Sequence, residues 1–324
     1  MTSINSTYGR FLDLTRQTQS LNNELYSLQE QLATGKKPGG LAGVSRDAGQ
    51  LLKGKEVTQR TESYLRSLNA VDRRTEIYAN SLNSLSETAS DARETLIRLD
   101  DQDKVTEQIL TDQIDGWLND IEAALRTKDG DRFLFSGSAT EEPPTVSLTD
   151  IDVTDITTLK QPGDPAEVPG DSPAYANGAI NGADLWNRDG IHIDDSERME
   201  YGVSVAEPAI QDFVNSLLYA KSAVTDTTVA DPDARLAEAR DWLQRAVTGL
   251  GELEARNGFN QERAAAKREV HNGTLDFLEK TAGKIEDADL AEVSTKLSMT
   301  QTVLQASYQS TSRLLQTSLV NFLR

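Results

Sequence analysis

The 324-residue chain contains no cysteine, which excludes disulfide bonds, thiolate metal sites and cysteine nucleophiles. It has two histidines, His192 and His271, which lie far apart in the sequence and have no further histidine at metal-ligand spacing. No combination of serine, histidine and acid indicates a nucleophilic triad. The sequence therefore predicts no catalytic residue, no metal site and no cofactor. We expect a protein that is not an enzyme.

Basic residues are scarce as well. The chain has 33 Lys and Arg against 52 Asp and Glu, and its net charge is −19. Nucleic acids and anionic membranes attract Lys and Arg, so neither is an expected partner. No apolar run approaches the roughly 18 residues of a membrane-spanning helix, which predicts no membrane insertion. The first residues, 1–6, lack the basic start and apolar run of a cleaved signal peptide.

Two short stretches resemble ligand-binding motifs, and each lacks a required residue. Residues 49–55 match the start of a phosphate-binding loop, yet Glu56 occupies the position of the Ser or Thr that ligates magnesium. Asp150 and Asp152 resemble the start of a calcium loop, but Asp155 stands where glycine is required. We interpret both as ordinary helix or turn sequence, with weak calcium binding as the alternative for the second.

The last forty residues carry one apolar stripe on a helix that is poor in charge. Neither proline nor glycine occurs after Gly283, and from residue 294 on most positions outside the stripe are Ser, Thr or Gln. Apolar residues recur in steps of three, four and seven, which places them on one helix face: Leu290, Val293, Leu297, Leu304, Tyr308, Leu315, Leu319 and Phe322. We expect this stripe to require a partner helix.

The N-terminal residues supply a matching helix, expected from about Ser3 to Thr34. Its seam alternates steps of three and four, a pattern that favours a left-handed coiled coil. Core stripes of a helical bundle are the alternative interpretation. Because both terminal helices are poor in charge, we expect them to pair and to form an intermolecular assembly surface. Its predicted residues are Phe11, Leu14, Leu21, Leu25, Leu28, Leu32, Leu290, Val293, Leu297, Leu304, Tyr308, Leu315, Leu319 and Phe322.

Between the two ends, helices surround a stretch of different composition. A heptad pattern from Val57 to Leu99 predicts a helix of about 50 residues. A turn at 100–103, a helix to about Lys128 and a strand at 132–137 are expected next. Residues 140–204 then hold six of the nine prolines and fourteen acidic residues against three basic ones. Short β-branched runs at 146–148, 151–158 and 191–193 favour a small β domain, with a disordered acidic segment as the alternative.

Helices are expected to return at Pro208 and Pro232, with weak points at Asn257–Gly258, Gly273 and Gly283. The predicted fold class is mainly α: an elongated antiparallel helical bundle or coiled-coil rod formed by both chain ends, with a small inserted β-rich domain. Three domains are predicted: a terminal coiled-coil assembly domain, a helical rod domain with a short β element, and an acidic β-rich outer domain. Their ranges are 1–40 plus 284–324, 41–139 plus 205–283, and 140–204.

Several segments resemble the bacterial flagellin superfamily. They read LQEQLATGKK at 28–37, IEDADLAE at 285–292 and QTVLQASY at 301–308. Within the superfamily, GDRFLFSG at 130–137 and SLVNFL at 318–323 are similar to the hook-associated proteins of the hook–filament junction rather than to filament flagellins. The resemblance does not extend to the insert at 140–204. It also departs from the family after residue 36, where VSRDA at 44–48 replaces the usual Ser-Asp-Asp-Pro-like turn.

The resemblance implies a structural protein of the bacterial flagellum that joins hook to filament through its terminal helices. It implies an extracellular location, reached by type III export without a cleaved signal peptide. The implied partners are copies of the chain, a neighbouring hook-associated protein, filament flagellin, and an export chaperone on the C-terminal helix. It further implies terminal helices that order only on assembly. A self-polymerising filament flagellin is the alternative, and adhesin-type binding through the insert is a more remote one.

Overall fold

The computed structural model describes residues 2–38, 47–98, 107–154 and 188–322. These residues form six α-helices and two small antiparallel strand pairs, which confirms the predicted mainly α fold class. The chain divides into two compact units. The first unit contains residues 1–60 and 273–324, and the second contains residues 61–272.

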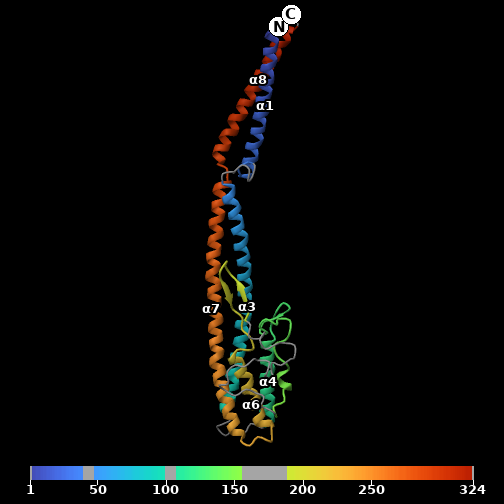
Figure 1. Cartoon of the computed structure of the whole chain (residues 1–324). Helices are drawn as coiled ribbons and strands as arrows, with labels where there is room; N and C mark the ends of the chain where they lie inside the picture. Colours follow the sequence, from blue (N-terminus) through green and yellow to red (C-terminus); the bar gives the residue numbers. More distant parts are fainter. Residues whose placement is uncertain (1, 39–46, 99–106, 155–187, 323–324) are drawn as a thin grey trace. The chain divides into compact units, whose positions relative to one another are not determined.

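The first unit is built around α1 (Thr2–Thr34) and α8 (Leu290–Phe322), which lie side by side and antiparallel (Figure 1). Gly35 ends α1 with a φ of 69°, and its N–H donates to the Gln31 oxygen at 2.8 Å. A glycine in this conformation commonly follows a helix C-terminus, and α1 ends at Thr34 as the sequence predicts. Asp289 begins α8, because its carboxylate accepts hydrogen bonds from the N–H groups of Ala291 and Glu292 at 3.0 and 3.2 Å.

The second unit packs four helices around one apolar core. They are α4 (Glu107–Leu125), α6 (Pro208–Thr225) and the larger parts of α3 (Ala48–Arg98) and α7 (Pro232–Glu286). Helix α7 begins at Pro232 as predicted, and Asp231 caps it, with its Oδ1 accepting from the Ala234 N–H at 3.0 Å. The core contains fully buried side chains from all four helices: Leu68, Leu82, Leu85, Ile114, Leu118, Ile121, Phe213, Leu217, Leu243 and Leu250.

Helix α7 is longer than the sequence predicts, because it continues through Asn257–Gly258 and Gly273 without a break. The Asn257 side chain is buried, and its Nδ2 donates to the Thr75 oxygen at 2.8 Å. That tertiary contact fixes the helix at a residue of weak helix propensity. A Cβ at Gly258 or Gly273 would meet nothing within 4 Å, so neither glycine marks a close approach. The predicted interruptions are therefore wrong.

The short β elements match the prediction in part. The strand expected at 132–137 covers only β2 (Arg132–Phe133), which pairs with β1 (Lys128–Asp129). The strand expected at 191–193 is confirmed as β3 (Gly190–His192), which pairs antiparallel with β4 (Arg198–Glu200). The run at 146–148 leads instead into a single 3-10 turn, η2 (Leu148–Asp150). The turn expected at 100–103 and the insert residues 155–187 lie outside the described residues.

Candidate assembly interface

A backbone clasp joins the end of α1 to the segment before α8. Lys36 forms an antiparallel bridge with Asp287, and the Ala288 N–H donates to the Gly35 oxygen at 2.9 Å. The Lys37 N–H donates to the oxygen of the residue before Asp287 at 2.8 Å. Two of the segments that carry the flagellin resemblance are therefore hydrogen-bonded to each other, although more than 240 residues separate them in the sequence.

Lysine side chains reinforce the clasp. Lys36 Nζ lies 2.6 Å from Asp287 Oδ1 and 3.6 Å from Glu286 Oε2, and Lys55 Nζ lies 3.7 Å from Glu286 Oε1. The hydrogen bond to Asp287 is the largest cause that raises the pKa of Lys36 above its ordinary value. Lys37 Nζ donates to the Ile285 oxygen at 2.6 Å. Because these groups are largely exposed, their ion pairs contribute little to the free energy of unfolding. We infer that they mainly fix the register of α1 against α8.

The seam between α1 and α8 is buried at one end and only partly covered elsewhere. Leu28 and Val293 are each 5 % exposed. Five further predicted residues are half-buried: Leu14, Leu21, Leu25, Leu297 and Leu304. A pair of helices covers only one side of each helix, so apolar side chains at the edges of the seam stay in contact with water.

Three predicted residues are more exposed still: Leu32 at 43 %, Leu290 at 49 % and Tyr308 at 51 %. Leu290 and Tyr308 lie on the same face of α8, since the 18 residues between them make about five turns. The Tyr308 hydroxyl accepts a hydrogen bond from Asn22 Nδ2 on α1 at 3.2 Å. The side chains of the other four predicted residues, Phe11, Leu315, Leu319 and Phe322, are outside the described part of the structure.

Sequence reasoning missed the polar members of the seam. Thr300 is 6 % exposed, and Ser307 and Thr311 are half-buried. With Leu297 and Leu304 they follow the three–four spacing of a coiled-coil seam. A stripe traced through apolar residues alone is therefore rotated around the axis of α8, toward the exposed face that carries Leu290 and Tyr308. The spacing itself was the signal that could have found them.

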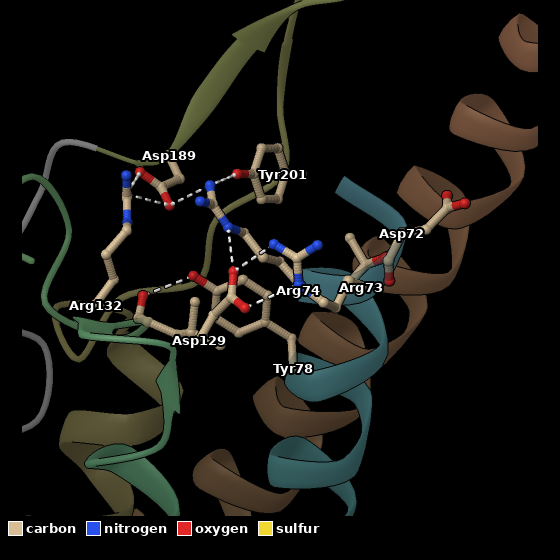
Figure 2. Close-up of polar contacts among 10 residues, drawn as sticks. Asp72, Arg73, Arg74, Tyr78, Asp129, Arg132, Asp189 and Tyr201 are labelled. Carbon is tan, nitrogen blue, oxygen red and sulfur yellow. Dashed lines mark hydrogen bonds and ion pairs between the residues drawn. The ribbon is translucent and has the colours of Figure 1, made fainter. Parts of the chain in front are cut away.

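A charged cluster in the second unit fixes the β1–β2 hairpin to α3. Asp129 accepts hydrogen bonds from Arg73 at 2.9 and 3.0 Å and from Arg74 at 2.9 Å (Figure 2). The hydrogen bond from Arg73 is the largest cause that lowers the pKa of Asp129 to about 2, and the hydrogen bond from Arg74 also lowers it. A carboxylate engaged by two guanidinium groups is a structural tie and a poor general base.

Among the described residues, no group of three or more His, Asp or Glu side chains is arranged to hold a metal ion. No helix in the described ranges is both long enough and apolar enough to cross a membrane.

Comparison with known proteins agrees with the resemblance. Residues 241–323 match the family model of the bacterial flagellin C-terminal helical region. A solved structure from Vibrio parahaemolyticus, described as a candidate flagellar hook-associated protein, shares the fold with a TM-score of 0.57 at 13% sequence identity. The match covers 74% of this chain and 97% of that one. Comparison with curated protein sequences finds no match.

The match at 241–323 includes most of α7 and all of α8, the helix that forms the seam with α1. A flagellin-type C-terminal helix is thus paired with the N-terminal helix of the same chain. The family match therefore confirms the resemblance to the bacterial flagellin superfamily over residues 241–323.

Proposed function

We propose that this protein joins the flagellar hook to the filament and assembles through α1 and α8. The observation that carries the proposal is the incomplete burial of the α1–α8 seam. The clasp fixes the register of the two helices, while Leu290, Tyr308 and the half-buried leucines keep an apolar edge exposed. Helices of adjacent subunits would cover that edge, because the hydrophobic effect favours removing it from water.

The partners of this assembly surface are copies of the chain, a hook-associated protein on one side and filament flagellin on the other. Before export, a chaperone would shield the same apolar edge of α8. The protein would act outside the cell, as a part of the flagellum. The similarity in fold to a candidate hook-associated protein supports the junction role, and the resemblance at 130–137 agrees with it.

A filament flagellin is the second candidate, because the matched family model describes flagellin itself. Seeded assembly separates the two functions. Purified protein is added to isolated hooks and to filament seeds, and the products are examined by sedimentation and negative-stain microscopy. A junction protein stays soluble alone and adds a short layer to hook ends. Long self-propagating filaments would contradict the junction role.

The seam itself is tested with one buried charge. Leu304→Asp places a carboxylate at a half-buried seam position, and we expect it to abolish addition to hook ends while the second unit stays folded. The matched control is Gln305→Asp, which adds the same charge at the next, exposed position and should assemble as the parent does. Equal assembly by both variants would remove the seam from the mechanism.

A further inference from the structure

Residues 188–201, which we call the strap, contain the β3–β4 hairpin and belong to the second unit. Figure 1 shows the hairpin lying along α3 and α7. Its strands are paired in register, with Gly190 opposite Glu200 and His192 opposite Arg198. The base and the tip of the strap are therefore joined by the strand ladder, so movement at one end reaches the other.

The base of the strap is fixed by two neighbouring residues of opposite charge. Arg188 donates to the carboxylate of Glu207 at 3.0 and 3.4 Å. Glu207 is 5 % exposed, lies next to the first residue of α6, and also accepts from Arg256 of α7 at 2.5 Å. The first residue of the pair thus binds the strap to the start of α6, and Glu207 links that point to α7.

The second residue, Asp189, binds the strap to the other side of the unit (Figure 2). Its carboxylate accepts from Arg132 at 3.0 and 3.1 Å and lies 3.7 Å from Arg74 of α3. Arg74 also donates to the Tyr201 hydroxyl at 2.6 Å. The Asp189 backbone oxygen accepts from the N–H groups of Tyr201 and Gly202 at 3.0 and 3.2 Å, which closes the base of the hairpin.

The tip of the strap carries acidic residues that meet basic residues on α7. Lys267 Nζ lies 2.5 Å from Asp194 and 2.9 Å from Glu197, and Arg263 lies 3.3 Å from Glu197. Arg263 and Lys267 are four residues apart, so they lie on the same face of the helix. Lys267, through its hydrogen bonds, is the largest cause that lowers the pKa of both Asp194 and Glu197.

The tip also contacts α3. The Tyr64 hydroxyl of α3 donates to Asp195 at 2.8 Å. Its ring stacks on His271 of α7 with a centroid distance of 5.6 Å, and His271 Nε2 lies 2.7 Å from the Ile193 oxygen. The tip thus touches both long helices, whereas the base touches α3 directly and reaches α7 through Glu207. Ile193, Met199 and Tyr201 of the strap are buried in the apolar core, and Ile191 packs against it.

We propose that the strap is a charge-held clamp across α3 and α7, which opens as one unit while the rest of the second unit stays folded. The strand ladder makes the opening concerted. Opening exposes only the few apolar side chains of the strap and breaks its ionic ties, so its free energy lies below that of unfolding the helical core, which buries many more apolar side chains. When the strap opens, the turns of α3 and α7 that it bridges, near residues 64–74 and 256–271, lose their shared contacts and become accessible to solvent.

Hydrogen exchange measured by mass spectrometry on the intact soluble chain tests this proposal. The double variant Arg188→Gln, Asp189→Asn removes both ties at the base. We expect exchange in 188–201 and in the bridged turns to accelerate about tenfold or more, since charge-assisted hydrogen bonds are lost. Exchange in α4 and α6 should stay at the parent rate. The measurement does not depend on assembly, so its outcome is separate from that of the junction role.

The matched control is Glu200→Gln, on the same hairpin. Glu200 pairs with Arg198 at 3.2 Å, and both side chains are about half exposed, at 58% and 48%. This variant changes one charge in the strap without touching either long helix, and it should exchange at the parent rate. Unchanged exchange in the double variant, or equal acceleration in α4 and α6, would overturn the proposal.

A second measurement needs no variant and therefore holds even if the double variant does not fold. In the parent chain, salt is raised from about 0.05 M to about 1 M, which shortens the screening length to about 3 Å. We expect faster exchange in the strap and the bridged turns and no change in α6, whose ties are mainly apolar. Strap exchange that is insensitive to salt would show that charge does not hold the clamp.

Discussion

The two units differ in how many of their apolar side chains are buried. Among the described residues, the second unit holds nearly every buried apolar side chain, and the first contributes only Leu28, Leu51 and Val293. Most of the large apolar side chains that stay exposed belong to the first unit: Leu12, Tyr26, Leu32, Leu52, Phe277, Leu290, Met299, Val303 and Tyr308. The second unit thus buries most of its own apolar side chains, whereas the first leaves apolar surface exposed, as the proposed assembly requires.

The largest expected effect comes from truncating one leucine in each unit. Leu250 is fully buried, so Leu250→Ala should lower the free energy of unfolding of the second unit by about 2–5 kcal/mol. Leu304 is half-buried at the seam, so Leu304→Ala should cost about 1 kcal/mol or less. Chemical denaturation of the soluble chain, followed by circular dichroism, measures both. Equal losses would contradict the contrast between the units.

A pair of glycines on α7 tests how tightly the second unit is packed. A Cβ at Gly249 would lie 2.6 Å from Ala209 Cβ and 3.4 Å from its Cα on α6. Gly249→Ala should therefore destabilise the unit by about 1–3 kcal/mol, although alanine favours helix. Gly251 has nothing within 4 Å, so Gly251→Ala should stabilise it by about 0.5–1 kcal/mol. Thermal unfolding of both variants measures the difference, and the same sign for both would contradict the close approach of α6 and α7.

The smallest effect concerns the charged tie of the β1–β2 hairpin. The pKa of Asp129 is lowered from 3.8 to about 2, so its contribution is present above pH 4 and is lost as pH falls toward 2. We expect about 1–2 kcal/mol of the free energy of unfolding of the second unit to disappear over that range. Asp129→Asn should remove this part of the pH dependence. A variant whose stability falls with acid as steeply as the parent's would show that other carboxylates dominate.

Sequence reasoning succeeded where local pattern and local chemistry coincide. Apolar spacing predicts α1, α3 and α8, and the structure confirms the helix end at Thr34 and the helix starts at Pro208 and Pro232. It failed at residues whose conformation depends on distant contacts. The sequence predicts a break in α7 at Asn257, because no pattern in the flanking residues indicates the hydrogen bond from Asn257 to the Thr75 oxygen of α3.

The candidate interface shows the same division. The sequence predicts that α8 carries an apolar stripe. It does not predict which side of α8 faces α1, because Ser307 and Thr311 are half-buried there and their residue types are typical of the surface. The clasp was likewise invisible as a contact. Its two segments were recognised separately as flagellin-like, and nothing in their residues states that Lys36 pairs with Asp287. The ties of the strap cannot be predicted from sequence, since they join it to four other parts of the chain: α3, Arg132, Glu207 and α7.

The sequence by itself determined the helical content, the charge-poor ends and the flagellin-like segments, because periodicity and motif are properties of consecutive residues. Only the tertiary structure decided the register of α1 on α8, the unbroken course of α7, and the partners that Arg188 and Asp189 bind. The physical reason is that hydrogen bonds and ion pairs between distant segments are selected by the packed fold. A residue such as Asp189 finds both Arg74 and Arg132 only after α3 and the β1–β2 hairpin have come together.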